Sequence, residues 1–246
     1  MVVHQPGQGP ITKAESDQRF MLLLEDDLED SPWMVMGSLQ FAAASEFFQS
    51  LRHYASRLQL PWFVAGMTPI LYAWPDYPRK RQLAPDVFVA FAPDRPRTSF
   101  DREAEGGFPA FVLEVVSPSS ADRDEVEKRT AYDMLGAREY ALFSPFPDRP
   151  SRLAGYRRNE SGRFEAWATD DQGRLWSDVL GLYLITQGTT IRAATRDGDL
   201  VPTLNEAVEA REREAASLRE ADVEIEQLRR EIEDLRRQVK GEEIAD

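Results

Sequence analysis

Two acidic residues interrupt stretches that otherwise read as buried strands. Glu114 stands in the middle of Phe111–Val116, which is apolar on both faces, and Asp86 follows Pro85 directly before the apolar run Val87–Phe91. Burying a carboxylate is costly unless it is paired with a cation or bound to a metal ion. If the two strands are neighbours, the two carboxylates can converge at one edge of the sheet. Two carboxylates with water and phosphate oxygens suit Mg²⁺, so we expect Mg²⁺ or Mn²⁺ there.

Lys128 lies on the helix expected after Glu114, and from there it can reach back to the two acids. Lysine supplies a point charge for a phosphate or for a metal-activated water. Two acids and a lysine form a workable set for metal-assisted hydrolysis of a phosphodiester. Each residue also has an ordinary alternative: Asp86 as a strand-start residue, Glu114 as a structural acid, and Lys128 as helix surface. The hypothesis depends on their order on strand, strand and helix.

A short basic cluster, Arg79, Lys80 and Arg81, precedes the strand that begins at Asp86. These residues could bind the phosphate backbone of a nucleic acid close to Asp86 and Glu114. That they belong to a solvent-exposed loop with no such role is an equally open interpretation. The whole chain is acidic, with 30 Lys and Arg against 43 Asp and Glu and a net charge of −13. This balance argues against broad electrostatic attraction to nucleic acid, but not against a small basic or metal-filled site.

Composition excludes several other kinds of site. The 246 residues include no cysteine and 2 histidines, which excludes a disulfide scaffold, a thiolate zinc site, a cysteine nucleophile and a multi-histidine metal site. The chain has no apolar run of about eighteen residues, and residues 1–20 lack the regions of a signal peptide. We therefore expect a cytoplasmic protein with no membrane association.

Apolar periodicity predicts one compact α/β domain over residues 21–203, preceded by a flexible tail over residues 1–20. Helices are expected over 38–58 and 122–135, the second ending at Gly136. This layout predicts a mixed β-sheet flanked by helices. Strands are expected over 62–65, 69–72, 84–91, 111–116 and 139–143, with peripheral strands over 153–157, 163–167 and 181–185.

Residues 204–246 read as a C-terminal coiled-coil helix. Apolar residues recur every seven positions in two series offset by three: Leu218, Ile225, Ile232 and Val239, and Ala221, Leu228 and Leu235. Such a seam, with β-branched residues at its first position, favours a parallel dimer. Glu224 and Glu231 are spaced to reach Arg229 and Arg236 of a second copy. We therefore expect a homodimer, with a helix packed back on the domain as the alternative.

Three motifs together resemble a known family. They are Ala84-Pro85-Asp86, then Glu114 followed by Ser117-Pro118-Ser119-Ser120, and then Lys128, Tyr132, Gly136, Ala137, Glu139 and Tyr140 at fixed spacing. The pattern resembles the Uma-two family of proposed restriction endonucleases, in the PD-(D/E)XK nuclease superfamily, over about residues 39–184. The resemblance implies a restriction-endonuclease-like fold and a metal-dependent endonuclease acting on DNA.

The resemblance also implies a role for each matched residue. Asp86 and Glu114 match the two metal ligands of the family. Val116 stands where the (D/E)XK motif would have its lysine, and Lys128 matches a lysine that has migrated to the following helix. Its implied role is to orient or activate the attacking water and to offset charge on the phosphate.

Further positions follow from the same resemblance. Glu46 is the candidate for an additional metal ligand from the first helix, and Gln40 stands near the place where many members carry a histidine. Gln40 and the basic cluster at 79–81 are therefore the candidate substrate contacts. Tyr132 and Glu139 match family positions too, but their helical and apolar settings favour packing roles.

Three functions remain open from the sequence. The first is a Mg²⁺-dependent DNA endonuclease, dimerised through its tail. The second is a catalytically silent nuclease-fold module that recruits a partner through the tail. The third is another metal-dependent hydrolase, acting on a small phosphorylated substrate. The joint presence of Asp86, Glu114 and Lys128 favours the first over the second.

Overall fold

A mixed six-stranded sheet forms the centre of the first of two units in a computed structural model that describes residues 37–74, 79–116 and 123–242. The tail expected over residues 1–20 lies outside these residues. Strands β6 and β7 are parallel and every other neighbouring pair is antiparallel. The strands, in sheet order, are β1 (Phe63–Gly66), β4 (Val87–Ala90), β6 (Phe111–Val115), β7 (Glu139–Ser144), β8 (Arg152–Arg158) and β9 (Phe164–Ala166).

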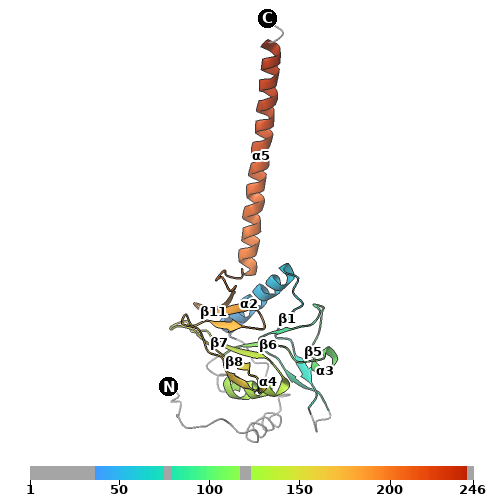
Figure 1. Cartoon of the computed structure of the whole chain (residues 1–246), viewed down its shortest axis with the longest axis vertical. Helices are drawn as coiled ribbons and strands as arrows, with labels where there is room; N and C mark the ends of the chain where they lie inside the picture. The colour runs from blue at the N-terminus through green and yellow to red at the C-terminus, as the bar shows by residue number, and fades with distance from the viewer. Residues whose placement is uncertain (1–36, 75–78, 117–122, 243–246) are drawn as a thin grey trace. The chain divides into compact units, whose positions relative to one another are not determined.

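Helices cover both faces of this sheet, which confirms the predicted α/β class (Figure 1). Helix α2 (Ser38–Arg57) packs on the face that carries Val87, Val89 and Leu113. The other face carries Phe88 and Val112 and is covered by a π-helical turn, η1 (Arg123–Lys128), that continues as α4 (Arg129–Leu135). Because side chains alternate along a strand, β1, β4, β6, β7 and β8 each supply both cores. The chain from β6 through α4 to β7 is the crossover that two parallel strands require.

Two small sheets complete the domain. The meander β10 (Leu175–Ser177), β11 (Leu182–Gln187) and β12 (Thr190–Ala194) extends the core on the α2 side. The second sheet joins β2 (Ile70–Tyr72), β3 (Arg81–Leu83) and β5 (Phe100–Asp101), and α3 (Arg102–Glu105) follows β5. The sequence did not predict β3, β5, β10 or β12. β5 has two residues and β3 reads Arg-Gln-Leu, so neither displays an apolar alternation.

The chain divides into two compact units, residues 1–201 and 202–246. The second unit contains α5 (Leu204–Glu242), whose start is set by a reciprocal cap. The Glu206 N–H donates to Thr203 Oγ1 at 3.1 Å, and the Thr203 N–H donates to Glu206 Oε2 at 2.8 Å. This capping box satisfies donors that would otherwise have no partner at a helix end. No helix in the described ranges is long and apolar enough to cross a membrane.

Apolar side chains of α5 are exposed along the predicted seam. Leu218, Ile225, Leu228 and Ile232 are between 47% and 62% exposed. The helix is therefore confirmed, and these four side chains are exposed. The pairing of two such helices stays a prediction.

Candidate active site

The two acids singled out in the sequence stand opposite each other on neighbouring strands. Strand β4 pairs antiparallel with β6, with Val87 opposite Leu113. One step further along the same ladder, Asp86 comes opposite Glu114. Opposite residues of an antiparallel pair project on the same face, with Cβ atoms about 4.5–5.5 Å apart. Asp86 is also held in place, because the backbone N–H of Val115 donates to its Oδ2 at 2.6 Å.

Glu114 is buried, with 2% of its surface exposed, and both of its carboxylate oxygens are engaged. Lys128 Nζ lies 3.0 Å from Oε2, and the hydroxyl of Tyr132 donates to Oε1 at 2.6 Å. Lys128 ends the π-helical turn and Tyr132 lies one helical turn later in α4. Residues four apart lie on one face of a helix, so this helix presents both groups to the same carboxylate.

Tyr132 keeps its proton in this setting. The side chain is completely buried, and burial together with the nearby charge of Glu114 raises its pKa well above the usual value of 10.0. A neutral hydroxyl is the better partner here, because a phenolate would be repelled by the carboxylate. Tyr132 therefore acts as a hydrogen-bond donor to Glu114 across the physiological pH range.

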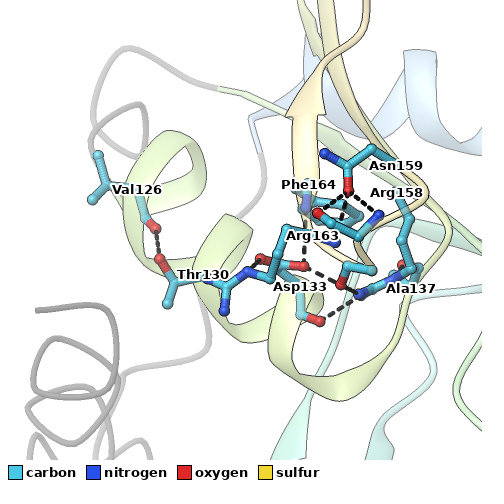
Figure 2. Close-up of polar contacts among 10 residues, drawn as sticks. Val126, Thr130, Asp133, Ala137, Arg158, Asn159, Arg163 and Phe164 are labelled. Carbon is cyan, nitrogen blue, oxygen red and sulfur yellow. Dashed lines mark hydrogen bonds and ion pairs between the residues drawn. The ribbon is translucent and has the colours of Figure 1, made fainter. Parts of the chain in front are cut away.

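The helix that carries Lys128 and Tyr132 is anchored at its far end through Asp133 (Figure 2). Oδ1 of Asp133 accepts from the N–H of Phe164 at 3.1 Å, and Oδ2 lies 3.1 Å from Arg163 Nε. Arg158 Nη2 lies 3.3 Å from Oδ1, and Arg158 Nε donates to the carbonyl of Ala137 at 2.9 Å. These contacts tie α4 to the β8–β9 hairpin and so fix the helix over the sheet.

The donor set of this site fits a small hard cation. Mg²⁺ takes oxygen ligands and is usually held by one or two carboxylates, with water and phosphate oxygens in its other positions. Asp86 and Glu114 supply two carboxylates on one face of the sheet. Within the described ranges no three His, Asp or Glu side chains gather as a metal site. Glu46 lies on α2, which packs on the opposite face, so its role as a third ligand stays a prediction.

The remaining predicted contacts are dispersed. Gln40 is half-buried on α2, while Arg79 is exposed and Arg81 lies in β3 of the second small sheet. Lys80 is already held by two carboxylates, because its Nζ lies 2.5 Å from Asp101 Oδ1 and 3.1 Å from Glu103 Oε2. A phosphate at Lys80 would have to compete with that ion pair.

Tyr132 and Glu139 were both expected to have packing roles, and in the structure their contacts differ. Tyr132 packs and also contacts Glu114, a contact whose only signal in the sequence is its four-residue spacing from Lys128. Glu139 is a structural acid, at the start of β7. It accepts hydrogen bonds from the hydroxyl of Ser177 and from the N–H groups of Asp178 at 2.7 Å and Val179 at 3.2 Å.

Comparison with known proteins places this chain in a family. The family model Uma2, described as "Putative restriction endonuclease", matches residues 14–194. The chain therefore belongs to the Uma2 family, as its motifs indicated.

A crystal structure from Anabaena variabilis ATCC 29413, described as "a putative nuclease belonging to DUF820", is similar to the chain. The two share 12% identity at a TM-score of 0.41, over 59% of this chain and 75% of that one. No curated protein matches.

Proposed function

We propose that this protein is a metal-dependent DNA endonuclease, with Asp86, Glu114 and Lys128 as its catalytic residues. The observation that carries the proposal is the meeting of these three side chains from two strands and one helix: Asp86 opposite Glu114 in the sheet, and Lys128 Nζ 3.0 Å from Glu114 Oε2. The family to which the chain belongs supports the reaction class, since its description names a restriction endonuclease.

In this proposal Asp86 and Glu114 would hold Mg²⁺ or Mn²⁺, and the ion would supply a lowered water pKa and stabilisation of the charge that develops on the phosphate. Lys128 lies beside these acids and orients the water by a hydrogen bond. The water oxygen bonds to phosphorus and gives up one proton, the bond between phosphorus and the leaving sugar oxygen breaks, and that oxygen takes up one proton, so that one product ends in a phosphate and the other in a hydroxyl group. The ammonium of Lys128 also offsets charge on the non-bridging phosphate oxygens.

The partly buried setting of Lys128 supports this role. Its side chain is 13% exposed, so its charge acts in a medium that screens it less than bulk water does. A lysine on an exposed helix surface would have a weaker effect on a phosphate at the same distance. The structural alternative for Lys128, ordinary helix surface, does not account for a contact with a carboxylate that is 2% exposed.

Cleavage of DNA in the presence of metal tests the proposal directly. The full chain is incubated with supercoiled plasmid and with single strands, with Mg²⁺ or Mn²⁺, beside Asp86→Ala and Lys128→Ala. Nicking that needs metal and is lost in both variants is the expected result. Equal nicking by wild type and both variants would point to a contaminant or a different site.

A homodimer formed through α5 is the assembly that we propose for this endonuclease. Exposure of Leu218, Ile225 and Leu228 along one stripe supports it, as does the self-complementary spacing of Glu224 and Arg229. A dimer would bring two such sites to one duplex. Light scattering of the chain truncated after Thr203 tests this, with a monomer as the expected result.

The same exposed stripe favours a second candidate function: a catalytically silent module that recruits a partner through α5. This candidate differs from the first in one measurable respect, since it needs neither metal nor Lys128. DNA binding that is absent at every salt concentration, together with no cleavage, would favour it. DNA binding that weakens steeply with salt would favour the endonuclease, because phosphate contacts release counterions.

A further inference from the structure

A fully buried hydroxyl lies next to the proposed metal ligands and has no part in the reaction as described so far. Tyr132 has no exposed surface, and its hydroxyl donates to Glu114 Oε1 at 2.6 Å. We propose that Tyr132 is a positioning residue that fixes the plane of the Glu114 carboxylate, so that Oε2 stays directed to Lys128 and to the cation. This inference rests on the proposed function, and it adds a residue that the family resemblance did not assign to the site.

The packing of the tyrosine ring fixes the position of its hydroxyl. The ring centroid of Tyr132 lies 5.0 Å from that of Tyr140 and 6.0 Å from that of Phe108. A ring enclosed in this way has little freedom about its two side-chain torsions. A carboxylate on a strand can rotate about its terminal bond, and a rigid donor on one oxygen removes that freedom. The donor therefore sets the direction of the second oxygen.

The two side chains that contact Glu114, Lys128 and Tyr132, differ in flexibility and exposure, and this difference suits different roles. Lys128 is a long, flexible side chain with some exposed surface, whereas Tyr132 is rigid and completely enclosed. When Lys128 turns toward a phosphate, Tyr132 still holds Glu114 in place. The hydroxyl also carries no charge, so it orients the carboxylate and leaves its negative charge available to the cation. Partners of this kind around a metal ligand typically change metal affinity or activity by about 10- to 100-fold.

Tyr132→Phe tests the inference because it removes the hydroxyl and retains the ring. Tyr156→Phe is the matched control: Tyr156 belongs to the same aromatic cluster, with its ring centroid 6.4 Å from that of Tyr140, and lies on β8 rather than on the helix. Binding of Mn²⁺ to each full-length protein is measured by calorimetry, and kcat and KM are measured on plasmid. We expect about 10- to 100-fold weaker Mn²⁺ binding and lower kcat, with KM for DNA unchanged, in Tyr132→Phe only.

The outcomes separate this inference from the proposed function. Mn²⁺ binding that is the same in wild type and Glu114→Gln would overturn the proposed metal site itself. Mn²⁺ binding that needs Glu114 but is unchanged in Tyr132→Phe would overturn only the positioning role. A loss of stability with normal Mn²⁺ affinity and normal kcat would also overturn it, since that is the signature of packing alone.

A measurement on the wild-type chain covers the case in which Tyr132→Phe does not fold. Addition of Mn²⁺ should perturb the near-ultraviolet spectrum of a buried tyrosine, because the cation draws charge from the carboxylate that accepts its hydrogen bond. The perturbation should be absent in Glu114→Gln and present in Tyr156→Phe. A wild-type chain that binds Mn²⁺ through Glu114 with no change in its tyrosine spectrum would count against the inference.

Discussion

Lys128 Nζ lies 3.0 Å from Oε2 of Glu114, although the two residues belong to a helix and to a strand. The (D/E)XK pattern would place its lysine two positions after the acid, on the same strand, where this chain has Val116. Val116 is 4% exposed and packs in the apolar core between the sheet and α4. The positive charge beside Glu114 thus comes from Lys128 on the helix, whereas Val116 on the strand packs in the apolar core.

Lys128→Met should reduce cleavage by about a hundredfold or more, because it removes a charge directed at the phosphate while keeping much of the side-chain volume. Arg129→Met is the control, since Arg129 is the adjacent cation and lies over the ring of Tyr156 at 4.8 Å, away from Glu114. Rates of plasmid nicking measure the effect. Equal losses in both variants would mean that the helix needs charge in general and would contradict a specific role for Lys128.

Glu114→Gln should abolish cleavage and Mn²⁺ binding while the chain stays folded. The amide keeps the shape of the side chain, and its oxygen can still accept from Tyr132 at the position of Oε1. The charge that would bind a cation is lost. Cleavage and circular dichroism are measured on the same sample. An unfolded Glu114→Gln chain would instead identify Glu114 as a structural acid that Lys128 must neutralise.

Stability should fall as pH rises through the range 4.5 to 6 because of Glu139. Burial raises the pKa of Glu139 from 4.5 to about 6 in the folded chain. Between these values the folded chain retains a proton that the unfolded chain has released, so raising the pH favours unfolding. A shift of this size corresponds to a contribution of about 2 kcal/mol to the free energy of unfolding. This contribution is fully present below pH 4.5 and is lost above pH 6.

Urea unfolding of wild type and Glu139→Gln at several pH values checks this prediction. The difference in unfolding free energy between the two proteins isolates Glu139, because every other titratable group is common to both. The difference should change between pH 4.5 and 6 and stay constant above. A difference that does not vary with pH would contradict a raised pKa at Glu139.

Asp133→Ala should destabilise the domain by about 2 kcal/mol, because it leaves the Phe164 N–H without an acceptor and removes the partner of two arginines. Asp133→Asn should cost less, because the amide oxygen can still accept from Phe164. Thermal unfolding measures both. Since Asp133 anchors the helix that carries Lys128, Asp133→Ala should also lower the cleavage rate. Normal stability in Asp133→Ala would mean that the Asp133 carboxylate does not anchor α4 to the hairpin.

Leu228→Lys should convert a dimer to a monomer, because it places a charge in the predicted seam of α5. Val223→Lys is the matched control: Val223 is 58% exposed on the same helix, but it lies outside the two heptad series. Light scattering of both full-length variants gives the oligomeric state. Dissociation by both substitutions, or by neither, would contradict a specific heptad interface.

The sequence alone determined the parts of this protein that depend on local rules. Helix α2 follows from the three- and four-residue spacing of its apolar side chains, and α5 follows from the seven-residue spacing of its apolar side chains. Glu114 could be recognised as unusual because a charge inside an apolar strand conflicts with the strand around it. These signals lie within a few residues of one another, so no knowledge of the remaining chain was needed.

Only the tertiary structure decided what depends on pairing between distant segments. The register of β4 against β6 set Asp86 opposite Glu114, and a slip of one residue would have sent one of them to the other face. The placement of α4 on that face gave Tyr132 its contact with Glu114, where the sequence had indicated packing. Glu46 and Lys80 were candidates by type. Only the structure shows that the helix carrying Glu46 packs on the other face of the sheet and that Lys80 is paired with Asp101 and Glu103, and their roles stay predictions. The residue types indicate which side chains are chemically suited to the reaction, and the packing of strands and helices decides which of these side chains lie close together.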